Sequence, residues 1–425
     1  MSSSPSRGSE LMEYRRIEGV EWIERYEPGG YHPVQIGDIL INRYRIVHKL
    51  GHGTFATVWL ALDQKSCAYV AVKIATADSE NKEASILRTI GKPAGSGSGS
   101  RCQTLITTVL DEFEIQGPNG RHQCYVTVAA RGSVSRIGRF SIFQLEAARA
   151  LAAQLALAVA YVHSQGFAHG DIHPGNILIK LPRQFDLLSV DQLYKSFGKP
   201  FTEPVVRIDE KPLPSGVPTH GISSIWFGKK AKEIPLEEAR LILGDFGESF
   251  SPSKEHRTGD DCHAPLSSMP PEAFFAPETP ISFSTDLWTL ACAIWSLLTP
   301  NPLFNASFAT VDEVVMQQVD IIGPLPSEWW DTWEERSEYF DETGQPTKDR
   351  EVDGSLELVV EDSLQKSRRD RQVGELCKEE TAALTSMLRS MLKFKPEERI
   401  TAEQVLESEW MRKWALPEFE KIPVD

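Results

Sequence analysis

Several short segments of the chain carry polar side chains whose types and spacing suit phosphate and metal chemistry. The most informative is FAHGDIHPGNILI, where Asp171 and Asn176 are five residues apart and bracket His173 in a tight loop. A carboxylate held beside an amide can orient a hydroxyl nucleophile while the other group binds a divalent metal. Asp245, in LILGDFGESF, follows an apolar strand and precedes a glycine, and its oxygens suit Mg²⁺. These residues predict a site where a hydroxyl reacts beside a bound metal.

A glycine-containing loop earlier in the chain is a candidate for binding phosphate. The sequence LGHGTFATVW runs from Leu50 to Trp59 between two predicted strands. Gly51 and Gly53 lack a Cβ, so the backbone can approach phosphate oxygens closely there. A GxG pair alone also fits an ordinary hairpin, so its interpretation depends on the other motifs.

Lys73 lies in the apolar strand AYVAVKIA, directly after Ala71 and Val72. A buried lysine needs partners because an unpaired buried charge is very costly. A phosphate together with a carboxylate would supply them. Glu83, where the amphipathic helix KEASILRTI starts, is the expected carboxylate, and Glu80 is the alternative. A solvated lysine on an edge strand is the other interpretation.

The elements that must position these residues change in type along the chain. Ile36 to Tyr69 and Thr104 to Ala130 alternate apolar and polar residues, which predicts antiparallel strands with a hairpin turn at Pro118–Gly120. Phe143 to Gly166 is rich in Ala and Leu and predicts a long buried helix that ends at a glycine. Helical patterns dominate after Ser284. We therefore expect an α+β protein with two lobes and a cleft between them.

Composition and charge exclude several classes of protein. Of the 425 residues, 41% are hydrophobic and 25% charged, as is usual for a soluble globular protein, and we expect no membrane partner. The six cysteines form no CxxC pair, which disfavours structural zinc or a disulfide framework and fits a reducing compartment. The net charge of −15 opposes nonspecific nucleic-acid binding. We expect a monomer in the cytoplasm, the nucleus or both.

Taken in order, the glycine loop, the AVK strand, HxDxxxxN and DFG resemble the signature of the protein kinases. The resemblance extends from about Tyr31 to Trp410. MPPEAFF is similar to the end of a kinase activation segment, with Glu272 as its glutamate. STDLWTLAC is similar to the helix that anchors the catalytic loop through Asp286, and MLKFKPEERI places Arg399 as the buried partner of the glutamate.

Within this family, YEPGGYHPVQIGDILINRYRIVHKLGHGTFATVWLALD closely resembles the start of the SR-protein kinases of the CMGC group. Those enzymes phosphorylate serines in Arg/Ser-rich proteins. The resemblance implies an ATP-dependent serine/threonine kinase with a small β-rich N-lobe and a larger helical C-lobe. We expect an N-terminal extension over 1–30, the N-lobe over 31–130 and the C-lobe over 131–425, with insertions at about 181–234 and 303–375.

The resemblance also implies a role for each catalytic residue. Asp171 would accept or orient the proton of the substrate hydroxyl. Asn176 and Asp245 would bind Mg²⁺. Lys73 would hold the α- and β-phosphates of ATP and pair with Glu83. The expected nucleotide-binding residues are Leu50, Gly51, Gly53, Val58, Ala71, Lys73, Thr127, Val128 and Ala130.

Three departures from the kinase pattern bear on activity. The third glycine of the loop is Ala56, a small change. Gly170 replaces the arginine before the catalytic aspartate, which normally pairs with a phosphate on the activation segment, so we expect no need for phosphorylation of that segment. His173 replaces the lysine that stabilises the transferring phosphate. With an unperturbed pKa of about 6.5, this histidine predicts activity that rises as the pH falls toward 6.

Two alternative functions remain open from the sequence. HGDIHPGN also matches aminoglycoside- and choline-type small-molecule kinases, but these do not usually carry the glycine loop, the PPE segment or the terminal PxxR helix found here. A pseudokinase that binds nucleotide as a scaffold is the second alternative, because of Gly170 and His173.

Two inserted segments bear on partners. The insertion at about 181–234 contains the apolar SSIWFG, and it is either a structural flap or a docking or regulatory element. Segment 311–362 carries sixteen Asp and Glu against three basic residues, a local charge of −13. It is either a docking surface for an Arg-rich peptide or a solvated acidic loop whose WWDTWEE core packs on the protein.

Overall fold

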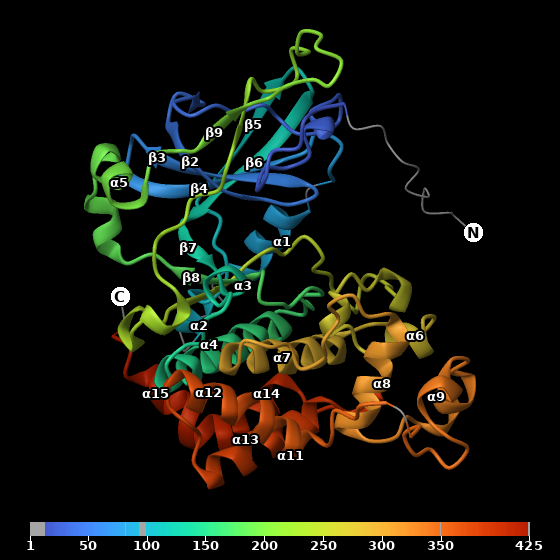
Figure 1. Ribbon diagram of the computed structural model, residues 1–425. Helices are drawn as coiled ribbons and strands as arrows, with labels where there is room; N and C mark the ends of the chain where they lie inside the picture. The colour runs from blue at the N-terminus through green and yellow to red at the C-terminus, as the bar shows by residue number, and fades with distance from the viewer. Residues whose placement is uncertain (1–12, 81, 93–98, 349, 424–425) are drawn as a thin grey trace. The chain divides into compact units, whose positions relative to one another are not determined.

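The computed structural model describes residues 13–80, 82–92, 99–348 and 350–423 (Figure 1). The first twelve residues of the expected N-terminal extension lie outside these residues. The described chain forms two compact units. The first contains the described residues up to Ala84, Thr108–Ala130 and Leu181–Gly228; the second contains those of Ser85–Thr107, Arg131–Lys180 and the chain from Lys229 onward. The first unit is mainly sheet and the second mainly helix, which confirms the α+β class.

An antiparallel sheet forms the centre of the first unit. Its strand order is β1-β2-β3-β4-β6-β5 (Figure 1). The strands are β1 (Ile39–Leu40), β2 (Tyr44–His52), β3 (Ala56–Asp63), β4 (Ala68–Ala75), β5 (Asp111–Gly117) and β6 (Gly120–Val128). The expected hairpin turn is confirmed, because Gly117 pairs with Gly120 across it. Alternate strand residues such as Trp59 and Val72 enter the core.

The strand expected from Thr104 begins only at Asp111. Residues 104–107 belong to the second unit instead, where they meet a different strand, β11 (Leu241–Leu243). The N–H of Leu243 donates to the Leu105 carbonyl at 2.7 Å, and the N–H of Thr107 donates back to Leu243 at 2.9 Å. A single bridge there replaces the expected strand.

The segment expected as an insertion in the C-terminal lobe groups with the first unit over Leu181–Gly228. It contains α5 (Val190–Phe197), β9 (Thr202–Pro204) and β10 (His220–Ile222). Phe185 and Phe227 lie in one buried cluster with Leu60 of the central sheet. The apolar SSIWFG stretch therefore packs on the protein, as its composition predicts.

Two long helices lie along each other in the second unit, α4 (Leu145–Ser164) and α7 (Phe283–Leu298) (Figure 1). The alanines of α4 allow close approach, and the helix ends at Ser164, shortly before Gly166, whose φ of +80° favours glycine. By length and composition alone, α4 could cross a membrane. However, 78% of its apolar window is buried inside the protein, as in the core helix of a folded domain.

The second unit also contains a second, smaller sheet and further helices. A small sheet has the order β11-β8-β7. The further elements are α1 (Glu83–Ile90), which starts in the first unit, α2 (Gly99–Gln103), β7 (Ala130–Ser133), α3 (Val134–Ile137), β8 (Ile177–Lys180), α6 (Glu272–Phe275), α8 (Val311–Ile322), α9 (Ser327–Thr332), α10 (Arg336–Tyr339), α11 (Leu356–Val359), α12 (Lys366–Arg371), α13 (Lys378–Met391), α14 (Ala402–Glu407) and α15 (Leu416–Glu420). Helices dominate after Phe283, as expected.

Candidate active site

The register of the central sheet brings the expected nucleotide-binding residues together. Gly51 of β2 pairs with Val58 of β3, and Val58 pairs with Lys73 of β4. On the next strand, Ala71 pairs with Thr127 of β6. Because paired residues of antiparallel strands lie about 5 Å apart, these five positions form one continuous patch of the sheet.

The glycine loop leaves open space beside its backbone. A Cβ atom added at Gly51 or Gly53 would meet no atom within 4 Å. The two glycines are therefore not required by packing within the protein, which leaves room for a ligand. Leu50 and Ala130 are half-buried and Val128 is 42% exposed, so all three remain accessible.

Lys73 forms the expected ion pair with Glu83. Its Nζ lies 2.7 Å from Oε2 of Glu83, the first residue of α1, and this carboxylate is only 4% exposed. Glu80 is not the partner, since it is 87% exposed and lies 3.8 Å from Lys82. The buried carboxylate holds the lysine in a fixed position on β4, where it can reach a phosphate.

Asp171 and Asn176 lie together in the catalytic loop of the second unit, between α4 and β8. The Nδ2 of Asn176 donates to the backbone carbonyl of Asp171 at 3.0 Å and to its Oδ2 at 2.9 Å. Oδ1 of Asp171 is buried and has no hydrogen-bond partner among the described residues. An unsatisfied buried carboxylate oxygen fits a site that receives a hydroxyl group from outside.

His173 is fixed in one tautomer beside the same aspartate. Its Nδ1 accepts the N–H of Gly175 at 3.0 Å, which places the proton of the neutral ring on Nε2. That Nε2 lies 3.4 Å from Oδ2 of Asp171. A Cβ added at Gly175 would lie 2.5 Å from the imidazole, so the loop needs a glycine there.

The buried His169 joins the catalytic loop to the segment of Asp245. Its Nδ1 accepts the N–H of Asp171 at 3.3 Å, and its Nε2 donates to the carbonyl of Gly244 at 3.1 Å. Burial lowers the pKa of His169, which favours the neutral ring that this pair of bonds requires. Phe246 packs edge-on against it, with ring centroids 4.7 Å apart.

Asp286 of α7 anchors the catalytic loop, as expected. Its carboxylate accepts the N–H groups of His169 at 2.6 Å and Gly170 at 2.9 Å, and Nε2 of His163 at 2.8 Å. Burial would raise the pKa of Asp286, but the hydrogen bonds that it accepts, from His163 first and from the Gly170 backbone, contribute to a net lowering of the pKa. The charged carboxylate therefore fixes the backbone directly before the catalytic aspartate.

The activation segment is held by contacts that the sequence did not reveal. Arg257 donates to the backbone carbonyl of Glu248 at 2.9 Å and lies 3.4 Å from its carboxylate. Nδ1 of His263 lies 3.0 Å from the same carboxylate. The arginine also covers the ring of Phe250, at 4.8 Å from its centroid. Both basic residues lie outside helices and strands, where no periodic pattern of the sequence indicates which charges meet.

Gly170 lies against this same backbone. Its φ is +81°, and an added Cβ would lie 2.6 Å from the carbonyl oxygen of Glu248. The position at which Gly170 replaces the usual kinase arginine thus has no room for any side chain.

The expected ion pair between Glu272 and Arg399 is confirmed. Nη1 of Arg399 lies 2.7 Å from Oε1 of Glu272, and Nη2 lies 2.5 Å from Oε2. The two side chains are 0% and 3% exposed, and Arg399 also covers the ring of Trp288 at 5.1 Å. This pair ties the end of the activation segment to the last helices.

Asn176 and Asp245 fit a Mg²⁺ site. The N–H of Gly244 donates to the carbonyl of Asn176 at 2.8 Å, so the backbones that carry the two residues are joined. Both side chains offer oxygen donors, which Mg²⁺ prefers. Asp245 adopts a φ of +58°, unusual for a residue other than glycine and typical of functional sites.

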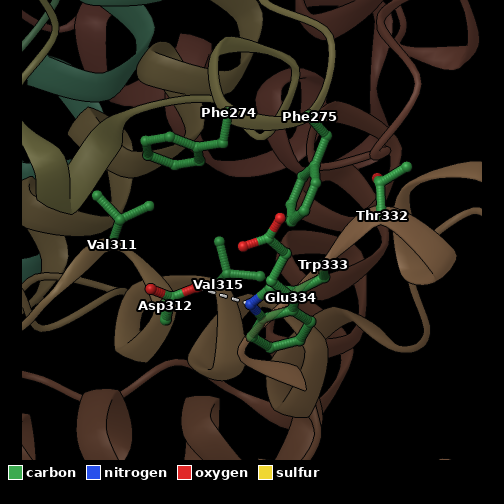
Figure 2. A pocket seen from close by; sticks show the side chains of 8 residues that line it. All are labelled: Phe274, Phe275, Val311, Asp312, Val315, Thr332, Trp333 and Glu334. Carbon is green, nitrogen blue, oxygen red and sulfur yellow. Dashed lines mark hydrogen bonds between the residues drawn. The ribbon is translucent and has the colours of Figure 1, made fainter. Parts of the chain in front are cut away.

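The acidic segment contributes a pocket of about 320 Å³ next to the end of the activation segment (Figure 2). Its lining residues are Phe274, Phe275, Val311, Asp312, Val315, Thr332, Trp333 and Glu334. The Nε1 of Trp333 donates to Oδ1 of Asp312 at 2.7 Å, and the carboxylate of Glu334 points between the rings of Phe275 and Trp333 (Figure 2). Trp329 and Trp333 are buried, so the WWDTWEE core packs as expected.

Comparison with known proteins gives a family match and several relatives. The family model for the protein kinase domain matches residues 44–189 and 230–411, leaving out most of the insertion. The serine/threonine-protein kinase SRPK of Physarum polycephalum is 26% identical over 92% of this chain and 91% of its own length. Protein kinase dsk1 of Schizosaccharomyces pombe is 25% identical over 94% of this chain and 86% of its own length. The serine/threonine-protein kinase spk-1 of Caenorhabditis elegans is 34% identical over 37% of this chain and 16% of its own length.

Proposed function

Because the chain belongs to the protein kinase family, we propose that it transfers the γ-phosphate of ATP, bound with Mg²⁺, to serine hydroxyls of Arg/Ser-rich proteins. Serine/threonine protein kinase activity is the part that its family and relatives share. The bound Mg²⁺ and the Arg/Ser-rich substrate are proposals that go beyond this shared activity. The arrangement of Asp171 supports the catalytic activity. Asn176 and His169 hold this residue, and one buried oxygen of its carboxylate is free to receive a hydroxyl.

The chain's own residues would each perform one task in the transfer. Oδ1 of Asp171 would accept or orient the proton of the serine hydroxyl, and the hydrogen bond from Asn176 to Oδ2 fixes the direction of that oxygen. Lys73, held by Glu83, would bind the phosphates of ATP. When bound by Asn176 and Asp245, Mg²⁺ would neutralise charge on the phosphates. Catalysis of this type rests on positioning and electrostatics.

The pocket of the acidic segment supports an arginine-rich substrate. A guanidinium group stacks on aromatic rings and pairs with carboxylates, and Phe275, Trp333 and Glu334 offer both kinds of partner in one place. The local charge of −13 would also attract a basic peptide over a longer range. We therefore favour docking over a merely solvated acidic loop.

Peptide kinetics with two matched variants test this docking role. In Glu334→Gln, we expect the KM for an Arg/Ser-repeat peptide to rise about fivefold or more, because a charge-assisted hydrogen bond is lost. Glu342→Gln removes an exposed carboxylate from the same segment but outside the pocket, so it should leave this KM unchanged. Raising the salt concentration should reduce the difference in KM between the two variants, because salt screens the charge of the carboxylate. Equal KM values for the two variants would show that the pocket does not bind the substrate. The assignment of the protein as a kinase would not be affected.

The ion pairs of the activation segment support activity without prior phosphorylation. Arg257 supplies a positive charge beside Glu248, and His263 contacts the same carboxylate, so no added phosphate is required to order this part of the segment. Protein purified from a bacterial host and treated with phosphatase should phosphorylate the peptide at the same rate as untreated protein. A loss of activity after phosphatase treatment would contradict this proposal.

A further inference from the structure

The N-terminal segment that precedes β1 contacts the tip of the glycine loop. The hydroxyl of Tyr31 donates to the carbonyl of Gly53 at 2.7 Å and lies 3.2 Å from that of Thr54. Nη1 of Arg25 donates to the same Thr54 carbonyl at 2.7 Å. The guanidinium also covers the Tyr31 ring, 5.3 Å from its centroid. Two side chains from outside the sheet thus bind two successive carbonyls of the loop.

Holding these carbonyls fixes the direction of the next two N–H groups. In a trans peptide, the C=O of one residue and the N–H of the following residue point in opposite directions. The contact at Gly53 therefore turns the N–H of Thr54 away from Tyr31, and the contact at Thr54 does the same for the N–H of Phe55. Successive backbone N–H groups pointing the same way form a concave binding site for anions.

The segment that carries Tyr31 is itself firmly held. The N–H of Tyr31 donates to the carbonyl of Arg25 at 2.9 Å, which sets the spacing of the two side chains. Nδ2 of Asn119, in the β5–β6 turn, donates to the Tyr31 carbonyl at 2.7 Å and to the carbonyl of Gly216 at 2.8 Å. The turn of the sheet therefore holds the residue that contacts the loop, and the insertion in turn binds the asparagine of that turn.

A buried charged pair attaches the same segment to the strand that leads into the loop. Glu21 accepts hydrogen bonds from Nζ of Lys49, on β2, and from the hydroxyl of Tyr26. The Lys49 side chain is fully buried and that of Glu21 is 3% exposed. Removing either partner would leave a buried charge unpaired, which is costly, so this attachment is strong. The N-terminal segment thus binds the glycine loop both at its base and at its tip.

We propose that Tyr31 and Arg25 are positioning residues that hold the glycine loop in its nucleotide-binding form. This inference rests on the proposed function, since it takes the loop to bind the phosphates of ATP. The N-terminal segment would then set the affinity for nucleotide without touching the nucleotide or the protein substrate.

Direct nucleotide binding and steady-state kinetics of Tyr31→Phe and Arg25→Leu test this role. Loss of one hydrogen bond to the loop should weaken binding of a non-hydrolysable ATP analogue with Mg²⁺ about two- to tenfold. The KM for ATP should rise by the same factor, while the KM for the peptide stays unchanged. Arg25→Lys keeps a donor for the Thr54 carbonyl and should recover part of the loss.

Tyr194→Phe is the matched control. It removes a tyrosine hydroxyl that donates to a backbone carbonyl of the same unit, that of Val47 at 2.9 Å, away from the loop tip. Nucleotide affinity in Tyr31→Phe equal to that of this control would overturn the inference. If the wild type binds the analogue but transfers no phosphate, the proposed function fails and the binding data still decide the role of Tyr31. If the wild type binds no nucleotide, both the proposed function and the proposed role of Tyr31 are refuted.

Discussion

Replacing Gly170 by alanine should damage the catalytic loop far more than the same change at Gly166. Both glycines have nearly the same backbone, with φ of +81° and +80°. They differ in their surroundings, because a Cβ at Gly170 would lie 2.6 Å from the carbonyl oxygen of Glu248, whereas a Cβ at Gly166 would meet nothing within 4 Å. The pair therefore separates backbone strain from steric conflict.

The expected magnitudes follow from this difference. An alanine in the left-handed region costs about 1–2 kcal/mol, which is all that Gly166→Ala should lose in free energy of unfolding. Gly170→Ala should lose about 1–3 kcal/mol more, because two backbone segments must move apart. Since Arg257 and His263 hold the Glu248 side of this contact, part of the shift should fall on Asp171, the next residue.

Denaturant unfolding and peptide phosphorylation by the two variants provide the measurement. We expect a lower free energy of unfolding for Gly170→Ala than for Gly166→Ala, and a kcat at least about tenfold below that of the wild type in the first variant only, from a displacement of about 1 Å. Gly170→Arg should behave like Gly170→Ala, so restoring the usual kinase arginine should not restore activity. Equal stability and equal kcat for the two alanine variants would refute the reasoning.

Three further predictions concern buried ionisable side chains. Arg399→Met should lower the free energy of unfolding by about 3–5 kcal/mol because it leaves Glu272 buried and unpaired, and adding Glu272→Leu should recover much of that loss in calorimetry. Burial lowers the pKa of His32 to about 4 in the folded protein. As the pH falls below 6.5, His32 is therefore protonated in the unfolded chain before it is protonated in the folded protein. The free energy of unfolding should therefore drop by about 2 kcal/mol at pH 5, and His32→Phe should show a flatter pH dependence in urea titrations. Glu83→Gln should raise the KM for ATP in kinase assays, whereas Glu80→Gln, at an exposed carboxylate, should not.

Residues with a local or periodic pattern could be placed from the sequence. Alternation and the turn residues predicted β2 to β4 and the β5–β6 hairpin, and the alanine-rich stretch predicted α4. The motif order also predicted two ion pairs that the structure confirms, between Lys73 and Glu83 and between Glu272 and Arg399. Burial requires a partner for each of these charges, so only a few carboxylates were candidates.

Contacts between loops could not be placed in this way. Arg257 and His263 reach Glu248 from irregular segments, where neither period nor spacing constrains which charges meet. The contact of Tyr31 with the glycine loop joins residues 22 apart through a single side chain. The insertion follows β8 of the second unit in sequence, yet Phe227 finds its apolar neighbours in the first. Burial of apolar area decided its position, and sequence order did not.

Phosphate transfer from ATP and Mg²⁺ to an Arg/Ser-repeat peptide tests the central claim most directly. Wild-type protein from a bacterial host should phosphorylate serines of this peptide, but neither a basic peptide without serine nor an aminoglycoside. Asp171→Asn should abolish the transfer while it retains nucleotide binding, because the residue orients the hydroxyl and does not hold ATP. Nucleotide binding by the wild type without transfer to any of these substrates would contradict the account and identify the protein as a pseudokinase.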